Sequence, residues 1–372
     1  MNHQQNNQEP QAPQVMWLAF VPRDALHFRD GRSFEAGESA RVLYPRPSTV
    51  AGAVGAALGH EAGTVRGPLP ASRLRGREDW KMYFPLPADV VPTKDGKWTR
   101  LRPIRSAATT DLHDPGMVLL SAPKAEAPAA DRWWSAQKLQ TYLSDSVDLA
   151  RRAEVDHSPF VLEHRTGIAR DNRTVLDAHL YSNEFLRLSE SAHTEWAILA
   201  QCVLTTGLRP APARAVRWGG EGRMADVEVV SCPMEWPRPP DTFPGGRVLV
   251  YLATPGIWRT RAPGGQWRTG WRPPLPANAV LRAAAVPGAE AIASASPRPD
   301  GTVRDVWQRW AVPAGSVYLI EFGGDDPETA AAEWAHRVHG TALEAQTAAP
   351  GSASHRLATA GFGLILTGRW ND

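Results

Sequence analysis

The stretch FVPRDALHFRDGRSFEAG, residues 20–37, places several charged side chains directly after the first apolar segment of the chain. They are Arg23, Asp24, Arg29, Asp30 and Arg32. Arginine presents a planar fork of N–H donors that suits phosphate and carboxylate groups. Two chemistries are therefore open. Either the charges neutralise each other on a loop, or part of the set is held open for an anion.

A second anion candidate lies in YPRPSTVAGAVGAALG, which begins at residue 44. Residues 48–59 read as a helix capped by Ser48. The start of a helix has unpaired N–H groups and the positive end of the helix dipole, so Arg46, Ser48 and Thr49 are placed to hold a phosphate. Gly52 and Gly55 each cost about 1 kcal/mol relative to Ala in a helix interior. Close packing of this helix on a sheet would account for both glycines.

Two glycine-rich segments precede apolar strands. RWGGEGR contains Gly219 and Gly220 and ends at Arg223, and GFGLILTGRW contains Gly361 and Gly363. Glycine allows a neighbouring backbone or a ligand to approach a strand edge closely. Each segment alone predicts a tight turn, but its recurrence keeps ligand contact open as the alternative.

Residues 162–188, LEHRTGIARDNRTVLDAHLYSNEFLRL, read as a long hairpin that turns near Asp171. Its basic side chains are His164, Arg165, Arg170, Arg173 and Arg187. An exposed arm with such residues suits the backbone of a nucleic acid. The alternative, which charge alone favours, is a solvated ribbon whose acidic residues neutralise their neighbours.

The segment WRTRAPGGQWRTGWRP, residues 258–273, interleaves tryptophan with arginine around a Gly264–Gly265 turn. Its members are Trp258, Trp267, Trp271, Arg259, Arg261, Arg268 and Arg272. Aromatic rings and arginines together stack bases and bind phosphates. They also form the centres of protein interfaces. Three Trp residues exceed what one stacked base needs, so we expect a protein neighbour slightly more than RNA.

The sequence offers no recognisable hydrolase or metal motif. Glu333, His336 and His339 occur on one predicted helix, but this spacing without a third strong ligand is usual for a surface helix. There is no GxSxG and no GxxxxGK. We therefore expect no metal, no cofactor and no catalytic residue.

Composition restricts the location and the partners. The 372 residues carry 41 basic and 39 acidic side chains, a formal net charge of +2, so any anion site must be local. Cys202 and Cys232 form no CxxC pair, which fits a reducing compartment. The polar N-terminus resembles no signal peptide, and we expect a cytoplasmic protein with no membrane segment.

The elements that must position these residues are mostly strands. Pro and Gly make up 33 and 31 residues without a period, which leaves little room for long helices. Strands are expected at 15–21 and in EFLRL, EWAILAQCVLT, ADVEVVSC, RVLVYLAT and SVYLIEF, and further helices at 131–145 and 327–340. We expect an α+β protein with a disordered tail at 1–14 and two domains, at 15–190 and 191–372.

Taken together and in order, PRDALHFRDGRSF, YPRPSTVAGAVGAAL, HRTGIARDNRTVLDAHLYSNEFLRL, RWGGEGR, PAGSVYLIEF and GFGLILTGRW resemble the third-subunit family of the Cmr complex, the type III-B CRISPR RNA-guided effector. The resemblance spans most of residues 15–370. It implies two ferredoxin-like, RRM-related RAMP domains with long loop and hairpin insertions, and a non-catalytic subunit that binds the 5′ handle of crRNA in antiviral defence. It also implies two neighbours, the polymerase-like large subunit and the first backbone RAMP subunit.

The family motifs carry over to particular positions. They are Arg29, Asp30, Gly31, Arg32, Arg46, Ser48, Thr49, Gly219, Gly220, Arg223, Gly361 and Gly363, with the hairpin residues His164, Arg165 and Arg170 beside them. The chain departs from the family where a Thr-Gly turn is expected, because it has DNRTVLDAHLY instead. The contacts of the hairpin tip are therefore in doubt.

The resemblance gives the first stretch a specific hypothesis. In an RRM-like fold the loop after the first strand lies close to the start of the first helix, so Arg29, Arg32 and Arg46 would converge on one phosphate. Asp30 would orient one of these arginines, and Arg23 would pair with Asp24.

Two alternatives remain open. A RAMP endoribonuclease that processes precursor crRNA would need His27 or His164 within reach of a 2′-hydroxyl. A Trp-rich carbohydrate-binding module would leave the glycine segments without a purpose.

Overall fold

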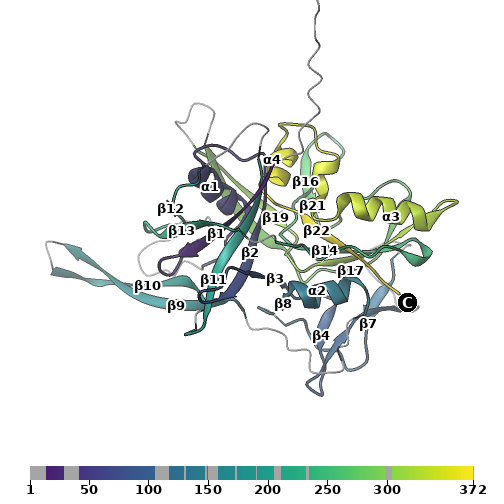
Figure 1. Cartoon of the computed structure of the whole chain (residues 1–372), viewed down its shortest axis with the longest axis horizontal. Helices are drawn as coiled ribbons and strands as arrows, with labels where there is room; N and C mark the ends of the chain where they lie inside the picture. The colour runs from purple at the N-terminus through teal and green to yellow at the C-terminus, as the bar shows by residue number, and fades with distance from the viewer. Residues whose placement is uncertain are drawn as a thin grey trace, which may run out of the picture.

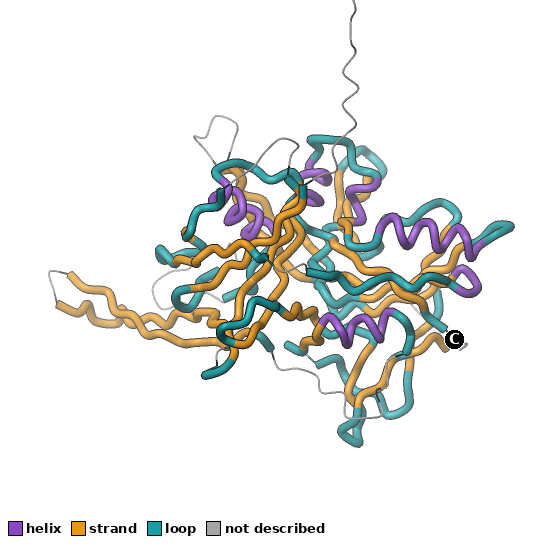
Figure 2. The backbone as a smooth tube through the Cα atoms, viewed as in Figure 1, coloured by secondary structure: helices purple, strands orange, loops and turns teal. Residues whose placement is uncertain are grey.

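The computed structural model describes residues 14–28, 42–104, 117–129, 131–146, 149, 158–171, 174–189, 191–204, 211–231, 234–297 and 304–371. In this part of the chain four α-helices accompany 22 strands, and the strands pair antiparallel (Figures 1 and 2). The expected α+β class is confirmed. Arg29, Asp30, Gly31 and Arg32 lie outside the described residues, as does the expected tail apart from Gln14.

The first sheet has seven strands in the order β12-β13-β1-β11-β2-β3-β8. Their bounds are β12 Ala215–Arg217, β13 Met224–Val229, β1 Val15–Pro22, β11 Thr194–Val203, β2 Thr64–Leu74, β3 Lys81–Pro85 and β8 Trp133–Ser135. The helix α1, Pro47–Leu58, lies between β1 and β2 in the chain and packs on the sheet. The four central strands, taken in chain order, stand in the order fourth, first, third, second.

The second sheet repeats this order. Its five strands run β17-β20-β14-β22-β21. Their bounds are β17 Ala279–Ala285, β20 Val317–Phe322, β14 Arg247–Leu252, β22 Leu364–Arg369 and β21 Thr341–Ala342. The helix α3, Pro327–Val338, follows β20 and packs on β20, β14 and β22. Without β21, the strands in chain order are β14, β17, β20 and β22. In the sheet they stand as β22-β14-β20-β17, which is again the order fourth, first, third, second.

The core has three main parts because both sheets are apolar on both faces. In β1, Leu18 and Phe20 point to the α1 side, whereas Trp17 and Ala19 point to the opposite side. The side of the first sheet that faces away from α1 and the side of the second that faces away from α3 share one cluster with α2, Ala136–Leu143. The two sheets therefore pack together through their inner faces, with one helix covering each outer face.

The remaining elements are hairpins and short helices inserted between the sheet strands. They are β9 Phe160–Asp171 with β10 Thr174–Leu188, β15 Trp258–Arg261 with β16 Trp267–Gly270, β18 Glu290–Pro297 with β19 Arg304–Ala311, β4 Val90–Pro92 with β5 Trp98–Arg100, β6 Arg102–Ile104 with β7 Leu119–Ser121, and η1 Pro244–Gly246, η2 Leu343–Gln346 and α4 Ala353–Thr359. The hairpin of β9 and β10, called the arm below, extends far from the body (Figure 1). Asp171 pairs with Thr174, so the predicted hairpin is confirmed, and residues 172 and 173 at its tip lie outside the described residues.

Three local predictions are corrected. The N-cap of α1 is Arg46 rather than Ser48, because Pro47 occupies the first helical position and Ser48 follows it. The helix expected from residue 131 begins only at Ala136, since Trp133–Ser135 pair with β3 as a strand. A Cβ on Gly52 would meet no atom within 4 Å, and one on Gly55 would make only an ordinary contact. Close packing therefore does not account for the two helix glycines.

The expected domain division after residue 190 differs from the membership of the sheets. The strands β11, β12 and β13 follow that position and belong to the first sheet. The chain passes to the second sheet between Val229 and Arg247. The division into two domains stays a prediction. No helix among the described residues is long and apolar enough to cross a membrane.

Candidate nucleic-acid interface

Three segments singled out in the sequence meet around Asp24. The loop after β1 contributes Asp24, the arm contributes Glu163, Arg165 and Arg187, and the glycine loop between β12 and β13 contributes Arg223. Arg165 donates from Nη1 to Asp24 Oδ2 at 3.1 Å and from Nη2 to Asp24 Oδ1 at 2.9 Å. Arg187 Nη2 donates to Asp24 Oδ1 at 3.3 Å. These five residues form what we call the Asp24 cluster.

The fold explains why these segments converge. β13 pairs antiparallel with the end of β1, which brings the glycine loop beside residues 23–28. Leu26 pairs with Leu186 in an isolated bridge, which ties the same loop to the base of the arm. The Arg165 and Arg223 guanidinium groups lie 4.8 and 4.6 Å from the centroid of the Phe185 ring. Both arginines therefore also make a cation–π contact with this ring.

The pairing differs from the prediction for Arg23 and Asp24. Arg23 donates from Nη2 to Asp226 Oδ1 of β13 at 2.6 Å instead of pairing with its neighbour. Adjacent residues at a strand end point to opposite sides, so each charge finds a partner on a different element. The hydrogen bond from Arg165 lowers the pKa of Asp24 well below its usual range, and the Ala25 backbone N–H contributes.

The charges of the Asp24 cluster do not cancel. The second carboxylate of the cluster, Glu163, accepts from Arg165 Nε at 2.6 Å and from Arg187 Nε at 2.8 Å. The cluster therefore contains three guanidinium groups and two carboxylates. One positive charge is left over on a partly exposed surface. The cluster can therefore hold its segments together and still attract an anion. Arg165 is engaged in this network rather than free along the arm.

The glycines of the two loops serve close packing. Gly219 has φ +89°, and a Cβ there would lie 2.9 Å from the His27 carbonyl oxygen, while the Gly220 N–H donates to that oxygen at 2.8 Å. Gly361 has φ +99°, and a Cβ there would lie 2.8 Å from the Val65 carbonyl oxygen of β2. Gly363 has φ +73°, and a Cβ there would lie 2.9 Å from the ring of Trp258. Ligand contact by these glycines stays a prediction.

Arg46 does not take the place expected at the start of α1. Its side chain is only 9% exposed and forms an ion pair with Glu290 of β18. Burial lowers the pKa of Arg46 to about 10. Its Nε is buried without a hydrogen-bond partner in the described part of the chain. The Thr49 N–H donates to the Arg46 carbonyl oxygen at 3.0 Å, and the phosphate site at Arg46, Ser48 and Thr49 stays a prediction.

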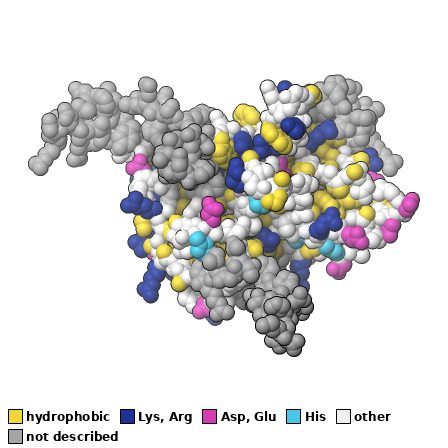
Figure 3. Space-filling model, turned by 90° about the horizontal axis from the view of Figure 1, so that it is seen from above, with side chains coloured by type: hydrophobic (Ala, Val, Ile, Leu, Met, Phe, Trp, Pro, Cys, Tyr) yellow, Lys and Arg dark blue, Asp and Glu magenta, His cyan; other side chains and the backbone are white. Residues whose placement is uncertain are grey.

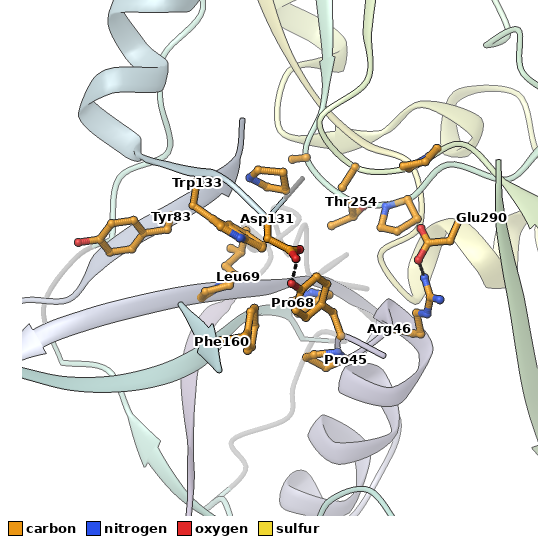
Figure 4. A pocket seen from close by; sticks show the side chains of 17 residues that line it. Pro45, Arg46, Pro68, Leu69, Tyr83, Asp131, Trp133, Phe160, Thr254 and Glu290 are labelled. Carbon is orange, nitrogen blue, oxygen red and sulfur yellow. Dashed lines mark hydrogen bonds and ion pairs between the residues drawn. The ribbon is translucent and has the colours of Figure 1, made fainter. Parts of the chain in front are cut away.

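Arg46 instead borders a pocket of about 280 Å³ between the two sheets and the base of the arm (Figure 4). Four aromatic side chains line it, those of Tyr44, Tyr83, Trp133 and Phe160. The ring centroid of Tyr44 lies 4.7 Å from that of Phe160 and 6.2 Å from that of Trp133. The Tyr44 hydroxyl donates to the Asp131 carboxylate. The pocket combines stacking surfaces with two carboxylates and one guanidinium.

Sequence reasoning missed this pocket, because its walls come from segments far apart in the chain. Several lining residues stood in quoted segments, among them Tyr44 and Arg46 in YPRPSTVAGAVGAAL and Pro313 in PAGSVYLIEF, but nothing in the sequence indicated that these segments meet. Trp133 and Phe160 begin β8 and β9, and no spacing in the sequence indicated that they face each other. The high number of tryptophans, 15 in the sequence, was the one available signal.

The two histidines considered for catalysis have different surroundings. His27 is buried, and its Nδ1 lies 3.0 Å from the Glu184 carbonyl oxygen. The His164 side chain is 64% exposed, with Nδ1 3.9 Å from the Glu184 carboxylate. The side chain of Arg170 lies outside the described residues.

The face seen in Figure 3 carries Lys and Arg side chains in several small groups rather than in one continuous field. This distribution agrees with the net charge of +2. An anionic partner is therefore attracted to local sites, of which the Asp24 cluster is one.

Comparisons with known proteins give one family and a set of solved structures. Residues 18–370 match the family model described as CRISPR-associated protein (Cas_Cmr3). Two solved chains come from the Type III-B Cmr-beta complex bound to cognate target RNA, the second with AMPPnP as well. Each is 15% identical and aligns over 82% of this chain and 86% of its own, with TM-scores of 0.40 and 0.41. The comparison with curated proteins finds no similar sequence.

Proposed function

Because the chain belongs to the CRISPR-associated Cas_Cmr3 family, which confirms the resemblance seen in the sequence, we propose that it is a non-catalytic RNA-binding subunit of a cytoplasmic type III-B effector complex. In this proposal it binds the 5′ handle of crRNA. It joins the polymerase-like large subunit to the backbone RAMP subunits in antiviral defence.

We also propose that the two sheets are the centres of two ferredoxin-like RAMP domains. The support is that both sheets carry the same order of four antiparallel strands, β13-β1-β11-β2 and β22-β14-β20-β17. The first retains a helix after its first strand, α1, and the second a helix after its third strand, α3. In this interpretation hairpins replace the other helices among the described residues.

The observation that carries the RNA-binding proposal is the Asp24 cluster. The loop after β1, the arm and the glycine loop all stood among the family motifs, and they meet there with one positive charge in excess. Phosphate oxygens accept hydrogen bonds from arginine as carboxylates do. The RNA backbone would pass this surface, with Arg187 and Arg223 donating to phosphate.

The pocket beside Arg46 supports recognition of a base. Single-stranded RNA is read through unstacked bases that lie on aromatic side chains and form hydrogen bonds at their edges. Tyr44, Trp133 and Phe160 supply such surfaces, and Arg46 with Asp131 supplies a donor and an acceptor. Arg46 would then contact a base rather than the phosphate expected from the sequence.

The absence of catalysis is part of the proposal. His27 is buried and engaged with a backbone carbonyl, which suits a structural residue. The second candidate function, a RAMP endoribonuclease, keeps one supporting observation: His164 is exposed beside Glu184 at the base of the arm. A general base at that place would need a substrate 2′-hydroxyl within hydrogen-bond distance.

The proposal is tested with handle-labelled crRNA titrated into complexes reconstituted with each variant. Arg187→Ala and Arg223→Ala should each weaken binding by about 1–3 kcal/mol, as for hydrogen bonds to charged groups, for native and scrambled handles alike. Arg238→Ala is the control, because it removes an equal charge from an exposed pair with Glu235 outside the cluster. If both cluster variants bound crRNA with wild-type affinity, the Asp24 cluster would not contact the RNA and the proposal would be wrong.

A further inference from the structure

The Trp- and Arg-rich hairpin forms a surface that the proposed function leaves unused. Strand β16 of this hairpin contacts β19, and Leu357 of α4 packs in one cluster with Ala311 and Trp307 of β19. The Arg259 guanidinium lies 4.5 Å from the centroid of the Trp267 ring, and that of Arg309 lies 4.7 Å from the centroid of Trp307. With Arg356 of α4, these residues form what we call the arginine–tryptophan surface.

Positive charge accumulates on this surface without enough compensation. Burial lowers the pKa of Arg309, the charges of Arg259 and Arg356 lower it further, and Glu344 acts in the opposite direction. Three guanidinium groups thus lie near Arg309, and a single carboxylate, Glu344, interacts with two of them, Arg259 and Arg309. Glu344 is itself buried, and its Oε1 accepts the Arg259 backbone N–H at 2.8 Å. Two positive charges remain, so an anionic partner would relieve the repulsion.

The exposed aromatic surface is smaller than the sequence suggested. Trp258 is buried in the core beneath α3, and its Nε1 donates to the Tyr318 hydroxyl at 3.2 Å. Trp271 is partly buried. Trp267 is 56% exposed and has one ring partner, Arg259. The argument for a protein neighbour rested on three available Trp residues, and one exposed indole beside arginines fits a stacked base better.

The pocket and the arginine–tryptophan surface lie at two positions along one ribbon. Glu290, which borders the pocket, pairs with Ala311, and Ile292 pairs with Arg309 two residues further along the same hairpin. Alternate residues of a strand point to the same side, so Glu290 and Arg309 share one face of the β18–β19 ribbon. Between them, Ile292 and Ala311 are buried against Leu357 and Phe362, so a packed part of the ribbon separates the pocket from Arg309.

We propose that the arginine–tryptophan surface binds a single-stranded segment of RNA, with one base on Trp267 and the adjoining phosphates at Arg309 and Arg356. The inference rests on the proposed function and adds a second contact surface to it. Nonspecific stacking and phosphate contacts tolerate any sequence, so this surface holds RNA without selecting it.

The test uses two variants, each with a matched control, in the full chain within the reconstituted complex. The variants are Trp267→Ala and Arg356→Ala. Trp310→Ala and Arg268→Ala are the controls, because each removes an exposed side chain of the same type from the opposite face of its strand. Fluorescently labelled crRNA serves as the probe, and native mass spectrometry without RNA reports subunit association.

Each variant should weaken crRNA binding roughly tenfold, the effect of one lost stacked base or phosphate contact. The controls should stay within about twofold, as for exposed residues elsewhere. Subunit association without RNA should not change. Wild-type affinity in both variants would overturn this inference and leave the proposed function intact. Loss of subunit association in Trp267→Ala would make the surface a protein interface and also overturn it. A wild-type complex that binds no crRNA would refute the proposed function and this inference with it.

Discussion

Gly361, in the loop before the last strand, lies against the backbone of Val65 in the first sheet. A Cβ on Gly361 would stand 2.8 Å from the Val65 carbonyl oxygen and 3.0 Å from that of Gly67. Real side chains do not approach a backbone oxygen this closely. The loop before β22 thus lies directly against β2, at a distance that leaves no room for a side chain at residue 361.

Gly361→Ala should therefore destabilise the protein by roughly 2 kcal/mol or more, since it adds a clash to a strained φ. Gly222→Ala is the matched control, because Gly222 also has positive φ, +65°, but a Cβ there meets nothing within 4 Å. It should cost only about 1 kcal/mol, from backbone strain alone. Urea denaturation measures both, and equal losses would show that the close approach is unimportant.

The exposed helix glycine predicts a change of the opposite sign. Gly52 lies in α1, and a Cβ there has open space. Gly52→Ala should raise the free energy of unfolding by about 0.5–1 kcal/mol, because alanine is the better helix former. A decrease in the free energy of unfolding, measured by the same denaturation, would contradict the open space at Gly52.

Asp24 should control the attachment of the arm. Asp24→Asn removes the carboxylate that accepts from Arg165, Arg187 and Arg223, at a cost of about 1–3 kcal/mol for hydrogen bonds to a charged group. Hydrogen exchange of the backbone amides at the base of the arm should become faster. Asp226→Asn, which breaks only the exposed pair with Arg23, should change exchange there little. Equal protection in both variants would contradict this role.

Local patterns predicted much of the fold. The continuous apolar runs of β1, β14 and β20 and the helical pattern from residue 327 are short-range signals, and these elements appear where the sequence placed them. The arm was predicted as well, because a long polar hairpin also shows in local pattern. The tryptophans of β8 misled the prediction, since pairing with β3 overrides the helical pattern that follows.

The site was less accessible to sequence reasoning. Arg46 was singled out in the sequence, but its partner Glu290 lies on the distant β18–β19 hairpin. Likewise, Asp24 was paired with its neighbour Arg23, whereas the fold supplies Arg223 and the arm residues. Pairing between distant segments follows from topology. One sequence therefore names the charged residues but not their partners.

His339 should make stability depend on pH. Burial lowers the pKa of His339 to about 4, and the Pro237 carbonyl oxygen lies 2.6 Å from its Nε2. The unfolded chain binds the proton more readily, near pH 6.5, so this contribution is complete above that pH and is lost as pH falls toward 4. Between pH 7.5 and 5 the loss from this residue is about 2 kcal/mol. In His339→Gln the fall measured by urea denaturation should be smaller, and an identical fall would contradict the assignment.

The central claim is that this subunit binds the crRNA handle and does not cut it. The most direct measurement is photo-crosslinking of crRNA carrying 4-thiouridine in the handle, within the reconstituted complex, with the crRNA length followed on the same gel. The proposal predicts crosslinks to the segments around Asp24 and the Arg46 pocket, and crRNA of unchanged length with wild type and with His164→Ala. Handle crosslinks that miss this chain would contradict the claim, as would crRNA shortened by the wild type but intact with His164→Ala.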